Sequence, residues 1–376
     1  MEYLIGTVTV VWLVLLAAPW RSWSTKERLE PDHVKGTLDH SDVTVIIPAR
    51  NEAAGIGRTL LALADQGANL TIILVDDQSR DETARIARGT LVDGLKIIEG
   101  KPVPPAWTGK LWALEQGLCT VTTDLALLLD ADIELGRGMV GALKNKLNAG
   151  RVDLVSVMAW LRMDSFWEKL LAPAFIYFFK LLYPFSIGND PRSRLGVAAG
   201  GCILVRTAAL RKAGAFLSIR SSIIDDCALA SRVKACGGHT WIGLSHSVGS
   251  HRPYPRLADF WQMVERTAFT QLRYSVWLLL GTTLVMSGMY LVPWVSLFLG
   301  STVAKGFGLI AISGMMASYV PTLLYYRRSI LWAPTLPVIG ALYLLMTWSS
   351  AIRYWRHRAT EWKGRAIRPE TGEGKR

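Results

Sequence analysis

Three pairs of acidic residues stand beside apolar stretches of this sequence, and acids in such places can do chemistry. A single acid at a strand end is ordinarily the N-cap of the next helix, which accounts for one such residue but not for three pairs. Packing so many carboxylates together is costly unless cations or hydrogen-bond donors balance them. A divalent metal is the natural balance, and oxygen ligands suit Mg²⁺ or Mn²⁺, which complete their shell with substrate phosphates. The pairs are Asp76 with Asp77 after LTIILV, Asp130 with Asp132 after LALLL, and Asp225 with Asp226 before CALASRV.

Basic residues that could meet a phosphate stand in two further stretches. Lys110 lies in PAWTGKLWALEQG, where a Gly-Lys turn enters a predicted helix and an anion gains from free backbone N–H groups and a fixed charge. The plainer alternative, a solvated lysine at a helix start, stays open from the residues alone. Further along, HRPYPRLADFWQMVERTAF contains a cluster that could bind phosphate or, beside apolar segments, touch lipid headgroups. Its members are Arg252, Arg256 and Arg266.

Several other kinds of site lack their motifs. The sequence has no G-x-x-x-x-G-K-[ST] loop, no G-x-G-x-x-G after the first predicted strand and no G-x-S-x-G elbow, which argues against P-loop kinases, dinucleotide enzymes and serine hydrolases. His246 and His251, in SHSVGSH, are expected to be ordinary loop histidines rather than metal ligands. The four cysteines show no C-x-x-C spacing, so we expect reduced thiols, without disulfides or zinc.

Alternating strand and helix patterns must position these side chains. Such alternation predicts an α/β fold with a doubly wound, mostly parallel sheet that is covered on both faces. Ligands of such sheets sit beyond the carboxyl ends of the strands, where the acid pairs fall. Strands are expected at 43–49, 70–77, 153–160 and within 95–100 and 123–132, helices at 51–67, 79–89 and 111–118, and a Gly turn with a strand and a helix start over 196–210.

The composition is not that of a soluble enzyme. Hydrophobic residues make up 51% of the 376 residues, and the formal charge is +12, from 42 basic and 30 acidic residues. Because no long basic run or aromatic-studded sheet motif is present, we expect no nucleic-acid partner. Apolar membrane spans with flanking Lys and Arg on the cytoplasmic side explain both the hydrophobicity and the charge.

Residues 1–22 are predicted to be an uncleaved transmembrane anchor. Tyr3–Trp20 is a run of 18 uncharged, mostly apolar residues, which is about the minimum for a span. Positive charges follow this run instead of preceding it, which argues against a signal peptide and places the following domain in the cytoplasm. The aromatic-rich segment 166–185 carries charges and a proline, so we expect it to lie at the membrane interface.

Apolar segments at 275–304, 306–326 and 330–350 predict C-terminal transmembrane helices, and a basic tail follows at 351–376. Three crossings would put this tail, with eight Lys or Arg against three Glu, outside the cell, against the positive-inside rule. Either one segment is re-entrant, or 275–304 is a tight hairpin, or the rule fails. We favour a cytosolic tail.

The motifs together resemble the GT-A-fold inverting glycosyltransferases of family 2, over about residues 42–270. With the anchor, the C-terminal apolar segments and the WKGR of the tail, the chain resembles the membrane-bound branch that glycosylates lipids. It is most similar to the hopanoid-biosynthesis-associated glycosyltransferases of bacteria, and PPAWTGKLWAL and WKGR are the closest points. The family motifs are VTVIIPARNEA (43–53), ILVDDQSRDET (73–83), GKLWALEQG (109–117), LLLDADIEL (127–135), AAGGCILVR (198–206) and IIDDCAL (223–229).

The resemblance implies catalytic roles for two of the acid pairs. Asp132 would be the metal-coordinating acid of the D-x-D motif, with Mg²⁺ or Mn²⁺ as the ion, and Asp130 would face the donor sugar or ribose. Asp226 would be the general base, with Asp225 as its neighbour. It would take the proton of the acceptor hydroxyl as that oxygen attacks the anomeric carbon in one inverting displacement.

The resemblance also implies a donor pocket and an acceptor pocket. The acid of the V-D-D-x-S segment contacts uracil in the family, here Asp76 or Asp77, which implies a UDP-sugar donor. Lys110 would lie near the base or the diphosphate, and Gly200 and Gly201 would border the acceptor pocket. The loop after the first strand would line the nucleotide pocket with Pro48, Ala49, Arg50 and Glu52.

One stretch departs from the family pattern. Membrane members commonly carry Q-x-x-R-W after the base, whereas WQMVERTAF has Arg266 in place, Thr267 where Trp is expected, and Gln out of register by one position. This departure favours transfer of a single sugar over a processive polymer channel. The resemblance implies that Arg266 lies beside the leaving diphosphate. It also implies a multi-pass enzyme of the bacterial inner membrane whose cytosolic domain glycosylates a hopanoid-type lipid.

Alternatives stay open from the sequence. A polyprenyl-phosphate, ceramide or carotenoid sugar transferase, or a short-polymer synthase, would show the same motifs. The alternative that is not an enzyme is a membrane scaffold whose transferase-like domain has lost its activity. The presence of Asp132, Asp226 and Lys110 argues against such a loss.

Overall fold

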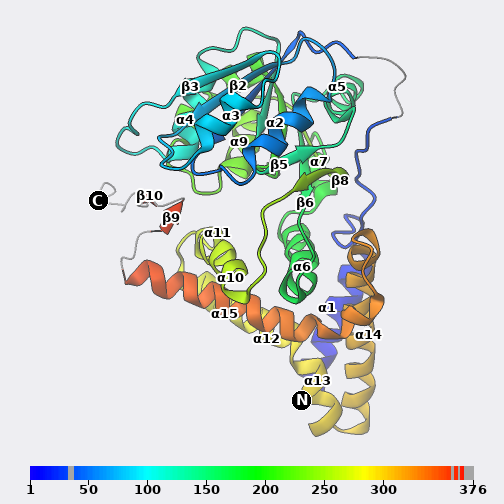
Figure 1. The fold of residues 1–376 in the computed structure, drawn as a ribbon. Coiled ribbons are helices and arrows are strands. Elements are labelled where there is room, and N and C mark those ends of the chain that lie inside the picture. The colour runs from blue at the N-terminus through cyan, green and yellow to red at the C-terminus, as the bar shows by residue number, and fades with distance from the viewer. Residues whose placement is uncertain (33–37, 357–359, 363–364, 368–376) are drawn as a thin grey trace. The chain divides into compact units, whose positions relative to one another are not determined.

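The computed structural model describes residues 1–32, 38–356, 360–362 and 365–367. Its chain divides into two compact units, which we name by their content (Figure 1). The helical unit consists of Met1–Lys26, Met163–Ser186 and Tyr254–Ala359, and the sheet unit consists of Glu27–Arg162, Ile187–Pro253 and Thr360–Arg376. The proposed domain at 42–270 therefore extends over parts of both units.

The sheet unit is built on eight strands in the order β3-β2-β1-β4-β7-β6-β8-β5. β1 is parallel to β2 and β4, and β2 is parallel to β3, while β7 runs antiparallel to both of its neighbours. β8 is parallel to β6, and β5 is antiparallel to β8. The strands are β1 (Val43–Ala49), β2 (Thr71–Asp76), β3 (Leu95–Glu99), β4 (Leu125–Leu129), β5 (Ile133–Leu135), β6 (Leu154–Trp160), β7 (Cys202–Arg206) and β8 (Thr240–Ser250).

Helices cover both faces of this sheet, which confirms the predicted doubly wound, mostly parallel α/β fold. α2, α3 and α5 contribute to the apolar core on one face, and α4, α8, α9 and η1 contribute to the core on the other. Strands buried on both faces carry mostly apolar side chains, as β1 and β4 do. These helices are α2 (Ile56–Ala64), α3 (Thr83–Gly89), α4 (Gly109–Leu118), α5 (Met139–Ala149), α8 (Thr207–Lys212), η1 (Phe216–Ile219) and α9 (Asp225–Ala235).

Three expectations for the sheet unit are wrong. The helix expected over 51–67 is shorter, Ile56–Ala64. The helix expected from residue 79 begins at Thr83, because the preceding residues bond to the loop after β1, with Ser79 Oγ accepting from Asn51 N at 3.0 Å. The stretch SHSVGSH is not a loop, since His246 lies within the strand β8 and His251 directly follows it. Its glycines and serines give little strand signal, and pairing with β6 and β5 forms the strand instead.

The helical unit contains most of the apolar helices. By length and composition alone, two helices in the described residues could cross a membrane, Thr302–Tyr325 and Ile330–Trp355. The pair α12–α13, bent by 48°, would make a third span or a re-entrant loop. The helices are α1 (Glu2–Ala17), α6 (Phe166–Leu182), α10 (Leu257–Glu265), α11 (Ala268–Gln271), α12 (Val276–Tyr290), α13 (Val292–Leu299), α14 (Thr302–Tyr325), η2 (Ile330–Thr335) and α15 (Leu336–Trp355), and α7 (Phe185–Asn189) crosses the boundary between the units.

α1 and α14 pack side by side in the same direction, as their contacts show. Thr9 Oγ1 donates to the carbonyl of Phe307 at 3.0 Å, and a Cβ added at Gly314 would lie 3.3 Å from Cβ of Trp12. With 16 residues, α1 is about 24 Å long, shorter than the roughly 30 Å hydrocarbon core of a bilayer. The predicted anchor is therefore a short helix that packs against a long one.

α15 ends beside the segment that precedes α12. Ser350 Oγ donates to the carbonyl of Glu265 at 2.5 Å and accepts from the backbone of Phe269 at 3.1 Å. Arg353 adds an ion pair with Glu265 at 3.0 Å. The predicted tail begins here, within the last turns of α15. Beyond residue 356, the short antiparallel pair β9 (Thr360–Trp362) and β10 (Arg365–Ile367) is described, and Lys363 and Gly364 of WKGR lie outside the described residues.

Candidate active site

The carboxyl ends of β1, β2 and β4 meet at one edge of the sheet, where two of the acid pairs follow. The parallel register places Ala49 opposite Asp76 and runs β4 alongside β1. Asp130, directly after β4, therefore lies on the same edge as Asp76. The third pair, Asp225 and Asp226, forms the first turn of α9.

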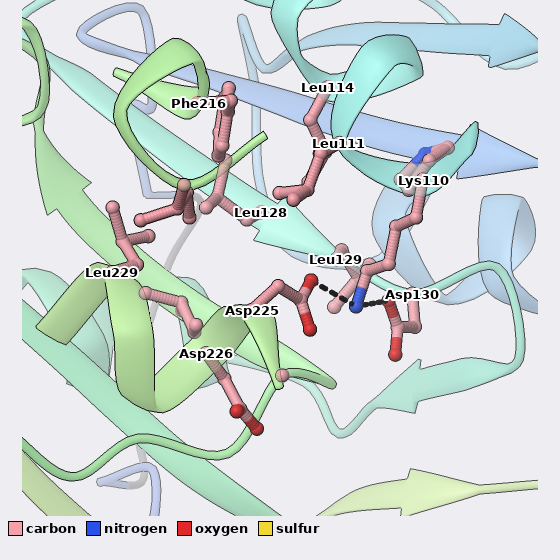
Figure 2. A pocket seen from close by; sticks show the side chains of 14 residues that line it. Lys110, Leu111, Leu114, Leu128, Leu129, Asp130, Phe216, Asp225, Asp226 and Leu229 are labelled. Atoms are coloured by element: carbon pink, nitrogen blue, oxygen red, sulfur yellow. Dashed lines mark ion pairs between the residues drawn. The ribbon is translucent and has the colours of Figure 1, made fainter. Parts of the chain in front are cut away.

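Lys110 joins the second acid pair to the third (Figure 2). Its Nζ lies 2.9 Å from Asp130 Oδ1 and 3.1 Å from Asp225 Oδ2. The position follows from the local sequence, because Thr108 caps α4 with its side chain and Lys110 is the second residue of that helix. Burial alone would lower the pKa of Lys110, but the charges of Asp130 and Asp225 outweigh it and raise this pKa above its ordinary value. The lysine thus stays charged between two acids.

Asp226 is the carboxylate whose acidity the site changes most clearly. Burial, with the charge of Asp225 next in size, raises the pKa of Asp226 to about 7. The backbone N–H of Cys227 donates to its Oδ1 at 2.7 Å, and a Cβ added at Gly200 would lie 3.5 Å from its Oδ2. A carboxylate with this pKa suits proton abstraction near neutral pH.

These residues line one pocket of the sheet unit (Figure 2). One side is acidic and holds the cation, and the other side is apolar. The lining residues are Pro48, Lys110, Leu111, Leu114, Leu128, Leu129, Asp130, Gly200, Ile203, Phe216, Ile219, Asp225, Asp226 and Leu229. Gly201 lies next to this pocket, and a Cβ added there would meet Ile133 at 3.1 Å.

The two acids of the first pair differ in their surroundings. Asp77 is buried, with 1% of its surface exposed, and its backbone N–H donates to the carbonyl of Ala49 at 2.8 Å. Asp76 is half-buried, and its carboxylate accepts from the backbone of Ser79 at 3.2 Å. Asp76 is therefore the better placed of the two to meet a ligand. The buried guanidinium of Arg50 donates to the carbonyl of Asp77, which ties the two loops together.

The fourth feature of the site is an arginine that the sequence did not assign to it. Arg252 Nε lies 2.8 Å from Asp132 Oδ2, and its Nη2 lies 2.7 Å from Glu52 Oε1. Ser250 Oγ also donates to Asp132 Oδ2, at 3.3 Å. No sequence signal marks this contact, because Arg252 reaches Asp132 through the pairing of β8 with β5, and the sequence did not predict β8.

Arg266 stands apart from the residues described so far. It is the C-cap of α10 in the helical unit, where its backbone N–H donates to the carbonyl of Gln262 at 3.2 Å. Its predicted place beside the leaving diphosphate stays a prediction.

A divalent ion fits these side chains only together with ligands from a substrate. Within the described residues, no group of three or more His, Cys, Asp or Glu side chains could hold a metal by itself. Asp132 offers carboxylate oxygens, the ligand type that Mg²⁺ and Mn²⁺ prefer, and one or two such protein ligands suffice when phosphates complete the shell. The donor set thus suits an ion that arrives with a diphosphate.

Part of the chain is similar to known proteins. The family model for Glycosyl transferase family 2 matches residues 44–214. The 4,4'-diaponeurosporenoate glycosyltransferases of Staphylococcus aureus strains RF122 / ET3-1 and USA300 are each 31% identical over 177 residues, which is 46% of this chain and 45% of theirs. The chain thus matches about half the length of these curated relatives.

The fold has a counterpart among solved structures. The mannosyltransferase PcManGT from Pyrobaculum calidifontis, in complex with GDP-Man and Mn²⁺, superimposes with a TM-score of 0.51 at 17% identity. The superposition covers 94% of this chain and all of that chain (100%). At this identity the likeness concerns the fold alone, which is of the GT-A type. Residues 44–214 therefore match glycosyl transferase family 2, the family that the sequence motifs resemble.

Proposed function

We propose that the protein transfers one sugar from a nucleotide-diphosphate sugar to a lipid acceptor, with inversion at the anomeric carbon. The observation that carries this proposal is the pocket in which Asp226, with a pKa of about 7, lies beside the Lys110 network of Asp130 and Asp225. A base and a charged donor-binding group on one pocket are what direct displacement requires.

The reaction uses these residues as follows. Asp226 accepts the proton of the acceptor hydroxyl while that oxygen forms a bond to the anomeric carbon. The bond from this carbon to the diphosphate oxygen breaks, and its electron pair leaves with the nucleoside diphosphate. Lys110 forms an ion pair with Asp225, and the charge of Asp225 contributes to the raised pKa of Asp226. Asp130, on the other side of Lys110, faces the donor sugar or ribose.

Asp132 would hold a Mg²⁺ or Mn²⁺ ion in this proposal. When bound, such an ion would neutralise charge that develops on the leaving diphosphate. The PcManGT complex contains both a nucleotide-diphosphate sugar and Mn²⁺, which supports this assignment. For this chain we propose a UDP-sugar, with Asp76 contacting the base and the loop of Pro48 and Ala49 lining the pocket.

The acceptor is a membrane lipid in this proposal. We assign a hopanoid-type triterpenoid, on the resemblance carried by PPAWTGKLWAL and WKGR. A carotenoid acid is the second candidate, because the curated relatives are named for 4,4'-diaponeurosporenoate. Gly200, next to Asp226, and its neighbour Gly201 border the acceptor hydroxyl in this proposal.

Contacts within the helical unit support a membrane arrangement for this proposal. α1 and α14 run in the same direction, so they would end on the same side of a membrane. α15 begins near the end of α14, and its own end bonds to Glu265 and Phe269, in the segment that precedes α12. We propose a multi-pass protein of the inner membrane with a cytosolic tail, as the positive-inside rule favours.

One experiment tests the proposed activity. Membranes with the wild-type protein receive a radiolabelled UDP-sugar, Mn²⁺ and extracted bacterial lipids, and the lipid products are separated and identified by mass spectrometry. We expect a monoglycosylated lipid, loss of product on metal chelation, and a fall in turnover of roughly 10²–10⁴-fold for Asp226→Asn. The control is Asp65→Asn, the same change at an exposed helix end.

Four outcomes would contradict parts of this proposal. A polyglycosylated product would favour the polymer synthase. A product formed only from polyprenyl phosphate would show that this lipid, and not a hopanoid, is the acceptor. Nucleotide binding without any turnover by the wild-type protein would support the inactive scaffold. A C-terminal alkaline-phosphatase fusion that is active outside the membrane would contradict the cytosolic tail.

A further inference from the structure

Arg252 forms an ion pair with Asp132, the acid that would receive a metal ion in the proposed function. Its guanidinium bridges Asp132 at 2.8 Å and Glu52 at 2.7 Å. The side chains of Glu52 and Asp132 are only 12% and 14% exposed, and that of Arg252 is 28% exposed. Ion pairs so far out of water are screened much less than pairs at the surface. The cation is therefore a strong partner for Asp132.

Sheet pairing fixes Arg252 in this place. β5 begins directly after Asp132 and pairs antiparallel with the end of β8, with Ile133 opposite Ser250. The backbone N–H of His251 donates to the carbonyl of Asp132 at 3.0 Å, which extends this pairing by one step. Arg252, the next residue, thus starts beside the D-x-D turn, and its long side chain reaches the loop that follows β1.

The charges of this cluster are unbalanced by one. Glu52 and Asp132 supply two negative charges and Arg252 supplies one positive charge, so the three side chains together carry −1. A divalent ion on Asp132 would meet attraction from the acids and repulsion from the guanidinium a few ångströms away. A diphosphate that arrives with the ion would remove this repulsion, since guanidinium groups bind phosphate oxygens well.

We infer that Arg252 is a resident counter-ion of the donor site. It holds Asp132 until a donor-bound divalent ion displaces it, and it thereby makes metal binding depend on the nucleotide diphosphate. Arg252 is a positioning residue, which acts through Asp132 and Glu52. This inference rests on the proposed function, because it takes Asp132 as the residue that receives the ion.

The test measures Mn²⁺ binding, without sugar transfer. Free Mn²⁺ is followed by electron paramagnetic resonance in titrations of the purified full chain with MnCl₂, with and without UDP. The variant is Arg252→Gln, and the matched control is Arg206→Gln, which removes an arginine that pairs with Asp153 elsewhere in the sheet unit. Thermal unfolding reports whether each variant is folded.

The inference predicts that the effect of Arg252→Gln on Mn²⁺ binding depends on whether UDP is present. Wild-type protein binds Mn²⁺ at least about tenfold more tightly when UDP is present, and Arg252→Gln binds Mn²⁺ alone about tenfold more tightly than wild type. In the variant, UDP then improves Mn²⁺ binding much less. An arginine with a merely structural role would weaken Mn²⁺ binding in both conditions when it is removed.

Two results would overturn the inference. A folded Arg252→Gln protein that binds Mn²⁺ alone no better than wild type shows that Arg252 does not compete with the ion. If this variant does not fold, the wild-type protein still provides a test. A wild-type Mn²⁺ affinity that is the same with and without UDP overturns the inference. Sugar transfer enters neither measurement, so an active enzyme without this pattern contradicts only the role of Arg252. An inactive protein with the pattern contradicts only the proposed function.

Discussion

Asp130 and Asp225 share one ammonium group, although one follows a strand and the other opens a helix much later in the chain. Lys110 Nζ lies 2.9 Å from the first and 3.1 Å from the second. In the proposed reaction Asp130 belongs to the donor and Asp225 neighbours the base. The lysine therefore couples the two halves of the site electrostatically, and a change of charge at either acid is felt at the other.

The first prediction concerns the pH dependence of turnover. Since Asp226 acts as a base only when it is ionised, and burial with the charge of Asp225 raises its pKa to about 7, turnover should fall as the pH drops below about 7 and level off above it. Initial rates at subsaturating acceptor, which report the ionisation of the free protein, would show this step between about pH 5 and about pH 9. A rate that stays flat down to about pH 5 would contradict Asp226 as the base.

The second prediction concerns the loss of the shared cation. Lys110→Met leaves Asp130 and Asp225 as neighbouring partly buried acids without their counter-ion, which should lower the free energy of unfolding by about 2–4 kcal/mol. Thermal unfolding in detergent measures this loss. A second change, Asp225→Asn, should restore part of the stability because it removes one of the stranded charges.

Lys144→Met is the matched control for this change. Lys144 pairs with Asp42, whose side chain is 40% exposed, so its loss should cost less than about 1 kcal/mol. If Lys110→Met is as stable as Lys144→Met, the two acids do not depend on the ammonium group.

The third prediction concerns a close approach between a glycine and a histidine. A Cβ added at Gly55 would lie 2.0 Å from Cε1 of His251, so Gly55→Ala must displace the ring. We expect a loss of about 1–3 kcal/mol in unfolding free energy and weaker Mn²⁺–UDP binding, because His251 adjoins Arg252. The double variant Gly55→Ala with His251→Ala should recover much of the stability.

Gly57→Ala provides the comparison, since its added Cβ would meet only Ile86, at 3.6 Å. This change lies inside α2 and should be neutral or slightly stabilising. Equal stability of the two alanine variants would show that the ring of His251 moves aside without cost.

The fourth prediction concerns the packing of α1 on α14. Gly314→Leu would push a large side chain against Trp12, which is fully buried, whereas Gly306→Leu in the same helix has no atom within 4 Å of its added Cβ. Close packing of small residues holds membrane helices together, so only Gly314→Leu should lower the thermal stability in detergent. A similar melting temperature for both variants would contradict this contact.

Much of the sheet could be predicted because its strands carry their signal locally. β1, β2 and β4 are mostly apolar runs with a defined end, and the acids at the ends of β2 and β4 fall where parallel strands place ligands. The Gly- and Ser-containing strand β8 could not be predicted, because pairing with β6 and β5 forms it and its own residues give no clear pattern.

Partners at the site were harder to predict than the residues themselves. Lys110 was expected to meet a phosphate, but its bonds to two acids depend on how α4 and α9 approach the sheet. Arg252 carried a basic charge in a basic stretch, and only the pairing of β8 with β5 brings it to Asp132. The choice between Asp76 and Asp77 needed the burial of each side chain.

The parallel packing of α1 on α14 has a consequence for how this protein should be prepared. Ile5 and Trp12 are fully buried against other helices, and the indole of Trp12 donates to the carbonyl of Met289 at 3.2 Å. Removing the first helix to obtain a soluble enzyme would uncover the apolar face of α14 and invite aggregation. A generic membrane anchor of equal hydropathy is no substitute, because α1 packs on its neighbours through close contacts of particular side chains.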